Sequence, residues 1–447
     1  MSEMYRNEVP QYGTLIGLVA DINAQTLDGQ PEWRTRMERS GEFERLHDER
    51  HGAIRVGTAA ELHTMRRLFA VMGMEPVGYY DLSVAGVPVH STAFRPVAEH
   101  ALQANPFRVF TSLLRLELIE DPALREQAAA ILARRRIFTP RVLALIAKWE
   151  SAGGLTRVEA GEFVTEALET FRWHGEATVD AGTYDALQKA HRLVADVVCF
   201  NGPHINHLTP RTLDIDAAQA AMSALGMDAK DVVEGPPRRQ CPILLRQTSF
   251  RALQETVRFA GQQQAVGAHT ARFGEIEQRG VALTRKGREL YDRLLAKVRD
   301  MDAAGSAASG YDARLNEAFR QFPDTHDELR TQGLAFYRYT LTDEGLANAG
   351  NAFDKDLQTL IDQGWAHAEP IIYEDFLPVS AAGIFQSNLG GEEQKQYQAV
   401  AARQAFEADL GARVHDEIAL YEALQQSSID QLFATLRIVA SQDRKKP

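Results

Sequence analysis

The sequence predicts an α+β fold that contains an internally duplicated strand-and-helix module. Residues 200–227 carry an extended histidine-bearing segment, Asp214 as a helix N-cap, an alanine-rich helix and a glycine stop. The same order occurs far upstream, where an extended segment that begins at His51 precedes a helix from Thr58 and a stop at Gly73. Two such copies in one chain predict a duplicated fold.

Composition narrows the class of protein. A chain of 447 residues with 45% apolar residues supplies a sizeable core and exceeds one ordinary domain. The net charge of −12 repels nucleic acid and anionic membranes, so we expect a small-molecule partner, no nucleic acid and no membrane. Residues 1–7 are polar and no run is long enough to span a bilayer, which predicts a cytoplasmic protein. Cys199 and Cys241 are too few for a disulfide scaffold.

The first region, residues 1–120, is predicted to hold N-terminal helices and the first module. Residues 8–50 have a helical, mixed composition. Thr58 with Glu61 three positions later is a capping box, which marks the start of the module's helix. Alternation and turn residues then predict three strands, at residues 77–81, 87–94 and 107–119.

Residues 121–198 are predicted to be a helical insertion between the two modules. Alanine, leucine, arginine and glutamate dominate this region. Helix starts are marked at Thr139, which precedes a proline, and at Thr156, which has Glu159 three positions later.

The second module is predicted at residues 199–300, and residues 301–447 are expected to add strands that complete the pocket, followed by C-terminal helices. The expected elements of these two regions are strands at 241–250, 269–278, 334–341 and 370–380, and helices at 283–298 and 390–437.

Side-chain alternation along strands sorts the candidate functional residues by face. His51 and Arg55 share a face of the first strand, and at 3.3 Å per residue they lie about 13 Å apart. In the second copy His207 shares a face with Thr209, whereas His204 points the other way. Only one histidine of that pair is therefore expected to face a common pocket.

If the two modules pack as pseudo-symmetric partners, His51 and His207 meet in the cavity between them. Two histidines leave a divalent metal without enough ligands, so we expect a carboxylate from a later strand. Glu275 and Glu277 lie on one face of such a strand, and the spacing leaves both open. Two histidines and one carboxylate on one side of iron leave positions for the substrate and the dioxygen of an oxygenase.

Other interpretations of these residues exist. The chain has 13 histidines and no short local motif that fixes a triad, and single histidines are more often packing or surface residues. His47 and His51 have helical metal-ligand spacing, but the glutamate between them is at neither position that zinc peptidases use. Residues 283–290 look like the end of a winged-helix domain, which gives a ligand-sensing regulator as the non-enzymatic alternative.

Three segments carry a resemblance to a known family: residues 51–55 (HGAIR), 201–211 (NGPHINHLTPR) and 272–275 (RFGE). There the chain resembles the 2-oxoadipate dioxygenase/decarboxylase family, the hydroxyglutarate synthases of bacterial lysine catabolism. That family is related to the vicinal oxygen chelate superfamily. The resemblance implies two βαβββ modules that form a central incomplete barrel.

The resemblance also implies an Fe(II) enzyme that converts 2-oxoadipate and O2 to 2-hydroxyglutarate and CO2. The implied metal ligands are His51, His207 and Glu275, and the preference for Glu275 over Glu277 depends on this match. Arg55, Val379 and Ser380 correspond to substrate-binding positions. The nearest enzymatic alternative is a glyoxalase-like metal-dependent lyase or isomerase, which does not consume dioxygen.

Overall fold

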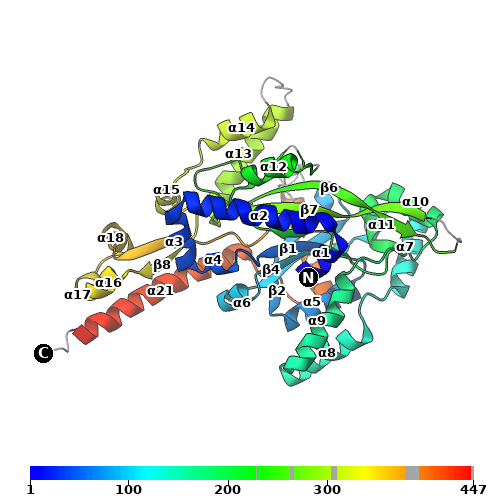
Figure 1. The fold of residues 1–447 in the computed structure, drawn as a ribbon, viewed down its shortest axis with the longest axis horizontal. Coiled ribbons are helices and arrows are strands. Elements are labelled where there is room, and N and C mark those ends of the chain that lie inside the picture. The colour runs from blue at the N-terminus through cyan, green and yellow to red at the C-terminus, as the bar shows by residue number, and fades with distance from the viewer. Residues whose placement is uncertain (228, 231, 262–265, 304–309, 378–391, 444–447) are drawn as a thin grey trace.

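A five-stranded sheet lies in the middle of the computed structural model (Figure 1). The structure describes residues 1–227, 229–230, 232–261, 266–303, 310–377 and 392–443. The strand order is β2-β3-β4-β1-β5, in which β1 and β4 are parallel and the other neighbouring pairs are antiparallel. The strands are β1 (Arg50–Val56), β2 (Met74–Asp81), β3 (Val89–Pro96), β4 (Phe107–Leu114) and β5 (Leu208–Pro210).

The region predicted as the first module contains β1, α5 (Ala59–Val71), β2, β3 and β4, in a βαβββ order. The predicted start of α5 is confirmed, because Thr58 Oγ1 accepts a hydrogen bond from the Glu61 backbone N–H at 3.2 Å. The Glu61 carboxylate does not complete a capping box on Thr58. It accepts a hydrogen bond from the Gly57 backbone N–H and forms an ion pair with the buried Arg135 guanidinium. This ion pair connects the start of α5 to the helical insertion.

The second region continues the sheet through β5. It consists of β5, α12 (Ile215–Ala224) and a long hairpin of β6 (Leu245–Arg258) and β7 (Val266–Arg279). Asp214 caps α12 as predicted, by accepting from two backbone N–H groups. Strand β5 pairs with β1, and a bridge between Arg211 and Glu277 joins its end to β7. The α+β class is confirmed, whereas the duplication, the incomplete barrel and the four-part division of the chain stay predictions.

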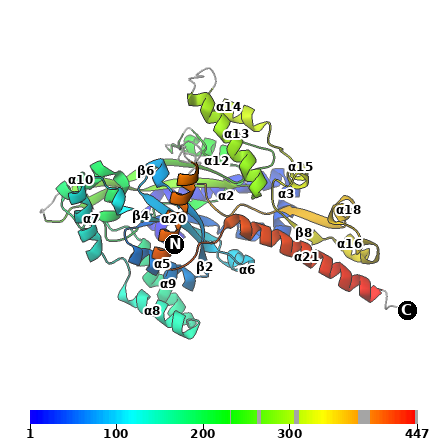
Figure 2. The ribbon, with the colours of Figure 1, turned by 180° about the vertical axis from the view of Figure 1, so that it is seen from behind.

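Helices surround this framework. In Figures 1 and 2, α10 (Ala181–Ala190) and α11 (Arg192–Val198) of the insertion lie at one end of the long axis, and α21 (Glu417–Asp443) lies at the other. Those before and within the first module are α1 (Ser2–Glu8), α2 (Pro10–Gly29), α3 (Pro31–Ser40), α4 (Glu42–Arg45) and α6 (Glu99–Ala104). The insertion holds α7 (Pro122–Arg134), α8 (Pro140–Ala152), α9 (Arg157–Phe171), α10 (Ala181–Ala190) and α11 (Arg192–Val198).

The C-terminal region packs a small sheet against long helices. Strand β8 (Tyr337–Leu341) pairs with β9 (Ala366–Pro370), and the largest apolar cluster joins this pair to α13 and α21. The helices here are α13 (Arg285–Ala303), α14 (Tyr311–Phe319), α15 (His326–Thr331), α16 (Asp343–Ala347), α17 (Ala349–Ala352), α18 (Leu357–Asp362), α20 (Glu392–Leu410) and α21 (Glu417–Asp443). Within the described residues, no helix combines the length and the apolar character needed to cross a membrane.

The strands predicted at 107–119, 241–250 and 370–380 differ most from the structure. The strand predicted at 107–119 ends at Leu114, and a short 3-10 turn follows it. The strand predicted at 241–250 begins only at Leu245, because Pro242 has no N–H to donate and Leu244 has a φ of +54°. The strand predicted at 370–380 is not formed by residues 371–377. There the backbone bonds to residues outside the β8–β9 pair, for instance Tyr373 N to Gly280 O at 2.9 Å.

Candidate metal centre

Three side chains from distant segments converge beside β1. His51 is on β1, His207 directly precedes β5, and Glu275 is on β7. One nitrogen or oxygen atom of each lies within 4.8 Å of the others. Glu275 Oε1 is 2.9 Å from His51 Nε2 and 3.3 Å from His207 Nδ1, and the two imidazole rings meet edge to face at 5.1 Å. The structure therefore brings together the three residues that the sequence indicated.

A glycine lets the two histidine-bearing strands approach. His51 is opposite Thr209 across β1 and β5, and Gly52 is opposite Leu208. A Cβ at Gly52 would lie 2.4 Å from Ile205 Cδ1 and 2.9 Å from the His207 carbonyl oxygen. Because the backbone of the second segment occupies the space of a side chain here, Gly52 sets the separation of the two imidazoles.

A second glycine positions the carboxylate. Gly274 lies opposite Phe250 in the β6–β7 hairpin, and a Cβ there would be 1.7 Å from Phe250 Cζ. The phenyl ring thus covers the glycine and packs against the hairpin. This arrangement fixes the backbone immediately before Glu275.

Aromatic rings pack against the two histidines of the site, and hydrogen-bond donors surround its carboxylate. Phe376 contacts His51 edge to face at 5.0 Å, and Phe273 stacks on His207 at 4.8 Å. Thr209 Oγ1 and Gln247 Nε2 each donate to Glu275 Oε1 at 3.0 Å. Aromatic walls lower the local dielectric, which strengthens each interaction of this carboxylate.

Electrostatics keep the carboxylates ionised. Burial alone raises the pKa of Glu275, but the nearby His207 and His51 outweigh it and hold that pKa well below its usual value. Burial alone lowers the pKa of His51, and the charges and hydrogen bonds of Glu277 and Glu275 outweigh it, so that the net shift is upward. The site therefore attracts positive charge, either protons or a cation.

The donor set fits a divalent transition metal. Two imidazole nitrogens and one carboxylate oxygen, gathered on one side, are the ligands of the facial triad that non-haem iron uses. His51 Nε2 faces Glu275, and the other nitrogen of the same ring faces a second carboxylate, so that Nε2 is the atom of this ring that would coordinate a metal.

Both glutamates that the spacing left open contact His51. Glu275 reaches Nε2 and also His207, whereas Glu277 Oε2 lies 2.8 Å from His51 Nδ1. The prediction that the two share a face of one strand is confirmed. Their contacts differ, because Glu275 alone of the pair lies beside both imidazoles.

Arg55 lies further along β1, where a polar cluster holds it. Its Nη1 donates to Asp196 Oδ2 at 2.9 Å and to Asn206 Oδ1 at 2.7 Å, and its side chain is 27% exposed. Asp196 Oδ1 in turn lies 2.9 Å from His269 Nε2 and 3.2 Å from His204 Nε2. Burial raises the pKa of Asp196, but these histidines and Arg55 keep it well below its usual value.

Sequence reasoning missed Asp196. The predicted helical insertion gives it no role, although it is a single acidic residue within an apolar run, Val194 to Val198. A buried carboxylate of this kind requires a cationic or donor partner. That requirement was the available signal.

Comparison with known proteins now identifies the family. Residues 1–388 match the family model described as HGLS, 2-oxoadipate dioxygenase/decarboxylase. The chain belongs to this family.

Relatives support this membership over nearly the whole chain. The 2-oxoadipate dioxygenase/decarboxylase of Pseudomonas putida is 59% identical over 446 residues, which cover 98% of this chain and 95% of the relative. That of Escherichia coli is 59% identical over 429 residues, with 96% and 95% covered. The crystal structure of hydroxyglutarate synthase from Pseudomonas putida in complex with 2-oxoadipate is 58% identical, with a TM-score of 0.90 and 98% and 96% covered.

Membership in the 2-oxoadipate dioxygenase/decarboxylase family confirms the resemblance inferred from the three segments. Val379 and Ser380, the two further substrate-binding positions that this resemblance implied, lie outside the described residues. The ligand and substrate roles of the remaining positions stay predictions.

Proposed function

We propose that this chain is an Fe(II)-dependent dioxygenase of lysine catabolism in the cytoplasm, which converts 2-oxoadipate and O2 to 2-hydroxyglutarate and CO2. The observation that carries the proposal is the convergence of His51, His207 and Glu275 within 4.8 Å, in a chain of this family. The rival glyoxalase-like lyase or isomerase would leave dioxygen untouched.

The bound metal would supply the redox chemistry, and the protein would supply geometry and exclusion of water. The atoms of the reaction balance when C1 of the oxo acid leaves as CO2. One oxygen atom of O2 enters the new carboxylate at the former keto carbon, and the other becomes the hydroxyl on the neighbouring carbon. The two buried imidazoles and the ionised Glu275 would hold the cation, and Phe376 and Phe273 would keep water from it.

We propose that Arg55 recognises the distal carboxylate of the substrate. Asp196 and Asn206 hold Nη1, whereas Nε and Nη2 make no hydrogen bond to any described residue. An anchored guanidinium with one free edge suits a bidentate, charge-assisted pair with a carboxylate, which lysine cannot reproduce.

The first test is an oxygen electrode. Metal-loaded protein should consume O2 when 2-oxoadipate is added and should release CO2 in equal amount. Decarboxylation or isomerisation without O2 consumption would refute the proposal and favour the lyase or isomerase. His51→Ala and His207→Ala should both remove metal binding and turnover, and retained metal stoichiometry would reject the ligand assignment.

The second test addresses Arg55. Arg55→Lys should lower kcat/KM for 2-oxoadipate by about 10- to 150-fold, since a charged hydrogen-bonded pair contributes about 1.5–3 kcal/mol. The loss for a 2-oxo monocarboxylic acid of the same length should be much smaller. Arg67→Lys is the matched control, because Arg67 also makes a bidentate pair, with Glu150 on the surface. Equal losses on both substrates would remove the proposed role.

A further inference from the structure

A second carboxylate faces the rear of a proposed metal ligand. Glu277 Oε2 lies 2.8 Å from His51 Nδ1, and both side chains are fully buried. Among the described residues nothing else is placed to accept a hydrogen bond from this nitrogen. The approach of the carboxylate is oblique, as active-site hydrogen bonds often are before the site is loaded. Glu277 is therefore the acceptor available to Nδ1.

One guanidinium clamps Glu277. Arg279 Nε donates to Glu277 Oε1 at 2.9 Å, and Arg279 Nη2 donates to Oε2 at 2.8 Å. The two residues are two positions apart on β7, so their side chains lie on the same face. A bidentate pair of this kind fixes the plane of the carboxylate as well as its position. Burial raises the pKa of Glu277, but Arg279 and His51 outweigh it and lower that pKa to about 2.

The same guanidinium also holds the other neighbour of His51. Arg279 Nη1 donates to the carbonyl oxygens of Tyr373 at 2.8 Å and Asp375 at 3.1 Å, and the guanidinium lies 5.7 Å from the centroid of the Phe376 ring. The edge-to-face contact of Phe376 with His51 thus depends on Arg279. Arg279 therefore positions both Glu277 and Phe376, the two side chains that contact the His51 ring here.

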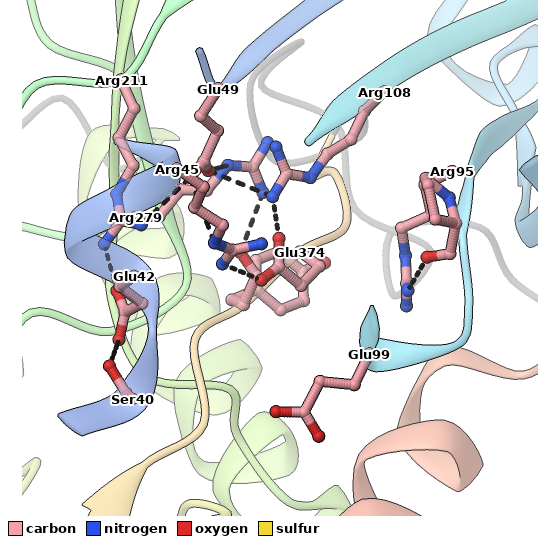
Figure 3. Close-up of polar contacts among 12 residues, drawn as sticks. Ser40, Glu42, Arg45, Glu49, Arg95, Glu99, Arg108, Arg211, Arg279 and Glu374 are labelled. Atoms are coloured by element: carbon pink, nitrogen blue, oxygen red, sulfur yellow. Dashed lines mark hydrogen bonds and ion pairs between the residues drawn. The ribbon is translucent and has the colours of Figure 1, made fainter. Parts of the chain in front are cut away.

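A buried network of charges keeps Arg279 in place. Figure 3 shows several arginines directed toward Glu49, and Arg279 Nε lies 3.8 Å from Glu49 Oε1. Arg108 and Arg211 lie 3.1 and 3.2 Å from the two oxygens of Glu49. Further pairs extend the network: Arg211 with Glu42, Arg45 with Glu374 and Arg108 with Glu374. Because a lone buried charge is costly, each member restricts the positions of the others.

We propose that Glu277 is a positioning residue for His51 and that Arg279 is its clamp. This inference rests on the proposed function, in which His51 binds the metal. A carboxylate on Nδ1 keeps the proton on that nitrogen and directs Nε2 toward Glu275, and it makes the imidazole a stronger ligand. Glu277 itself does not touch the metal or the substrate.

Cobalt(II) binding to the purified chain tests this role without turnover. Glu277→Gln keeps the size of the side chain and removes its charge, so it should weaken Co(II) binding by about 10- to 100-fold and alter the visible absorption spectrum of the bound ion. The matched control is Glu42→Gln, which removes one negative charge from the same network at a residue that pairs with Arg211. The control should lose thermal stability but keep the affinity and the spectrum of the wild type.

The outcomes separate the positioning role from the proposed function. Equal affinity in Glu277→Gln and wild type, or an equal loss in Glu42→Gln, overturns the positioning role alone. A wild-type chain that binds no Co(II) and consumes no O2 overturns the proposed function and, with it, this inference. If Glu277→Gln does not fold, anomalous scattering from Co(II)-loaded wild-type crystals decides instead. The ion is expected on the Nε2 side of His51, and a peak between Nδ1 and Glu277 would make Glu277 a ligand and overturn the inference.

Discussion

Replacing Gly52 by alanine should separate the two imidazoles. The new Cβ would lie 2.9 Å from the His207 carbonyl oxygen, about 0.5 Å closer than ordinary van der Waals contact, and 2.4 Å from Ile205 Cδ1. The Ile205 side chain can rotate, but the backbone at His207 has to move. Overpacking of this kind costs about 1–3 kcal/mol of folding stability.

The displacement falls directly on a proposed ligand. A constellation that has to be held within about 0.5 Å loses function when one member moves that far. We therefore expect Gly52→Ala to weaken Co(II) binding by at least about tenfold, or about 1.4 kcal/mol. Isothermal titration calorimetry measures the affinity, and urea unfolding measures the stability in parallel.

Gly57→Ala, directly after the end of β1, provides the control. A Cβ there meets its three nearest neighbours on the Leu132 side chain, the closest at 2.4 Å, so the clash can be relieved by a rotamer change. This variant should lose stability but keep its Co(II) affinity. Wild-type affinity in Gly52→Ala, or an equal loss of affinity in Gly57→Ala, would refute the reasoning.

Three further predictions concern stability. Arg135→Met leaves the Glu61 carboxylate buried without its partner and should cost about 3–5 kcal/mol in urea unfolding, and a cost below about 1 kcal/mol would contradict this account of the pair. Burial lowers the pKa of His326 to about 4, so as the pH falls the unfolded chain binds a proton at this residue before the folded chain does. The free energy of unfolding should therefore fall by up to about 3 kcal/mol between pH 6.5 and 4. His326→Asn should flatten the curve of Tm against pH in that window. Co(II) at about 100 times its Kd should stabilise the wild type by about 2.7 kcal/mol, a gain that a chelator reverses and that should be absent in His207→Ala, as differential scanning calorimetry would show.

The sequence predictions that the structure confirms depend on patterns between residues close together in the chain, namely strand alternation and helix capping. Strand alternation placed His207 beside Thr209, and their side chains lie 2.9 Å apart. The same rule put Glu275 and Glu277 on one face. Helix starts at Thr156 and Asp214 were readable because a cap and its partner are within three residues of each other.

Partners that are distant in the chain escaped prediction. Glu61 looked like half of a capping box, but its charge is neutralised by Arg135, which lies in another region of the sequence. The clamp of Arg279 on Glu277 was also unrecognised, since a glutamate and an arginine two positions apart on a strand look like ordinary surface residues. Burial of these charges is a property of the packed molecule, and no periodicity along the chain encodes it.

The central claim is that this site incorporates dioxygen into the product of decarboxylation. Turnover of 2-oxoadipate by the metal-loaded chain under heavy-oxygen-labelled O2, with mass spectrometry of both products, tests it most directly. The account predicts 2-hydroxyglutarate that carries two labelled oxygen atoms, one in the new carboxylate and one in the hydroxyl, together with unlabelled CO2. A 2-hydroxy product without label would contradict it.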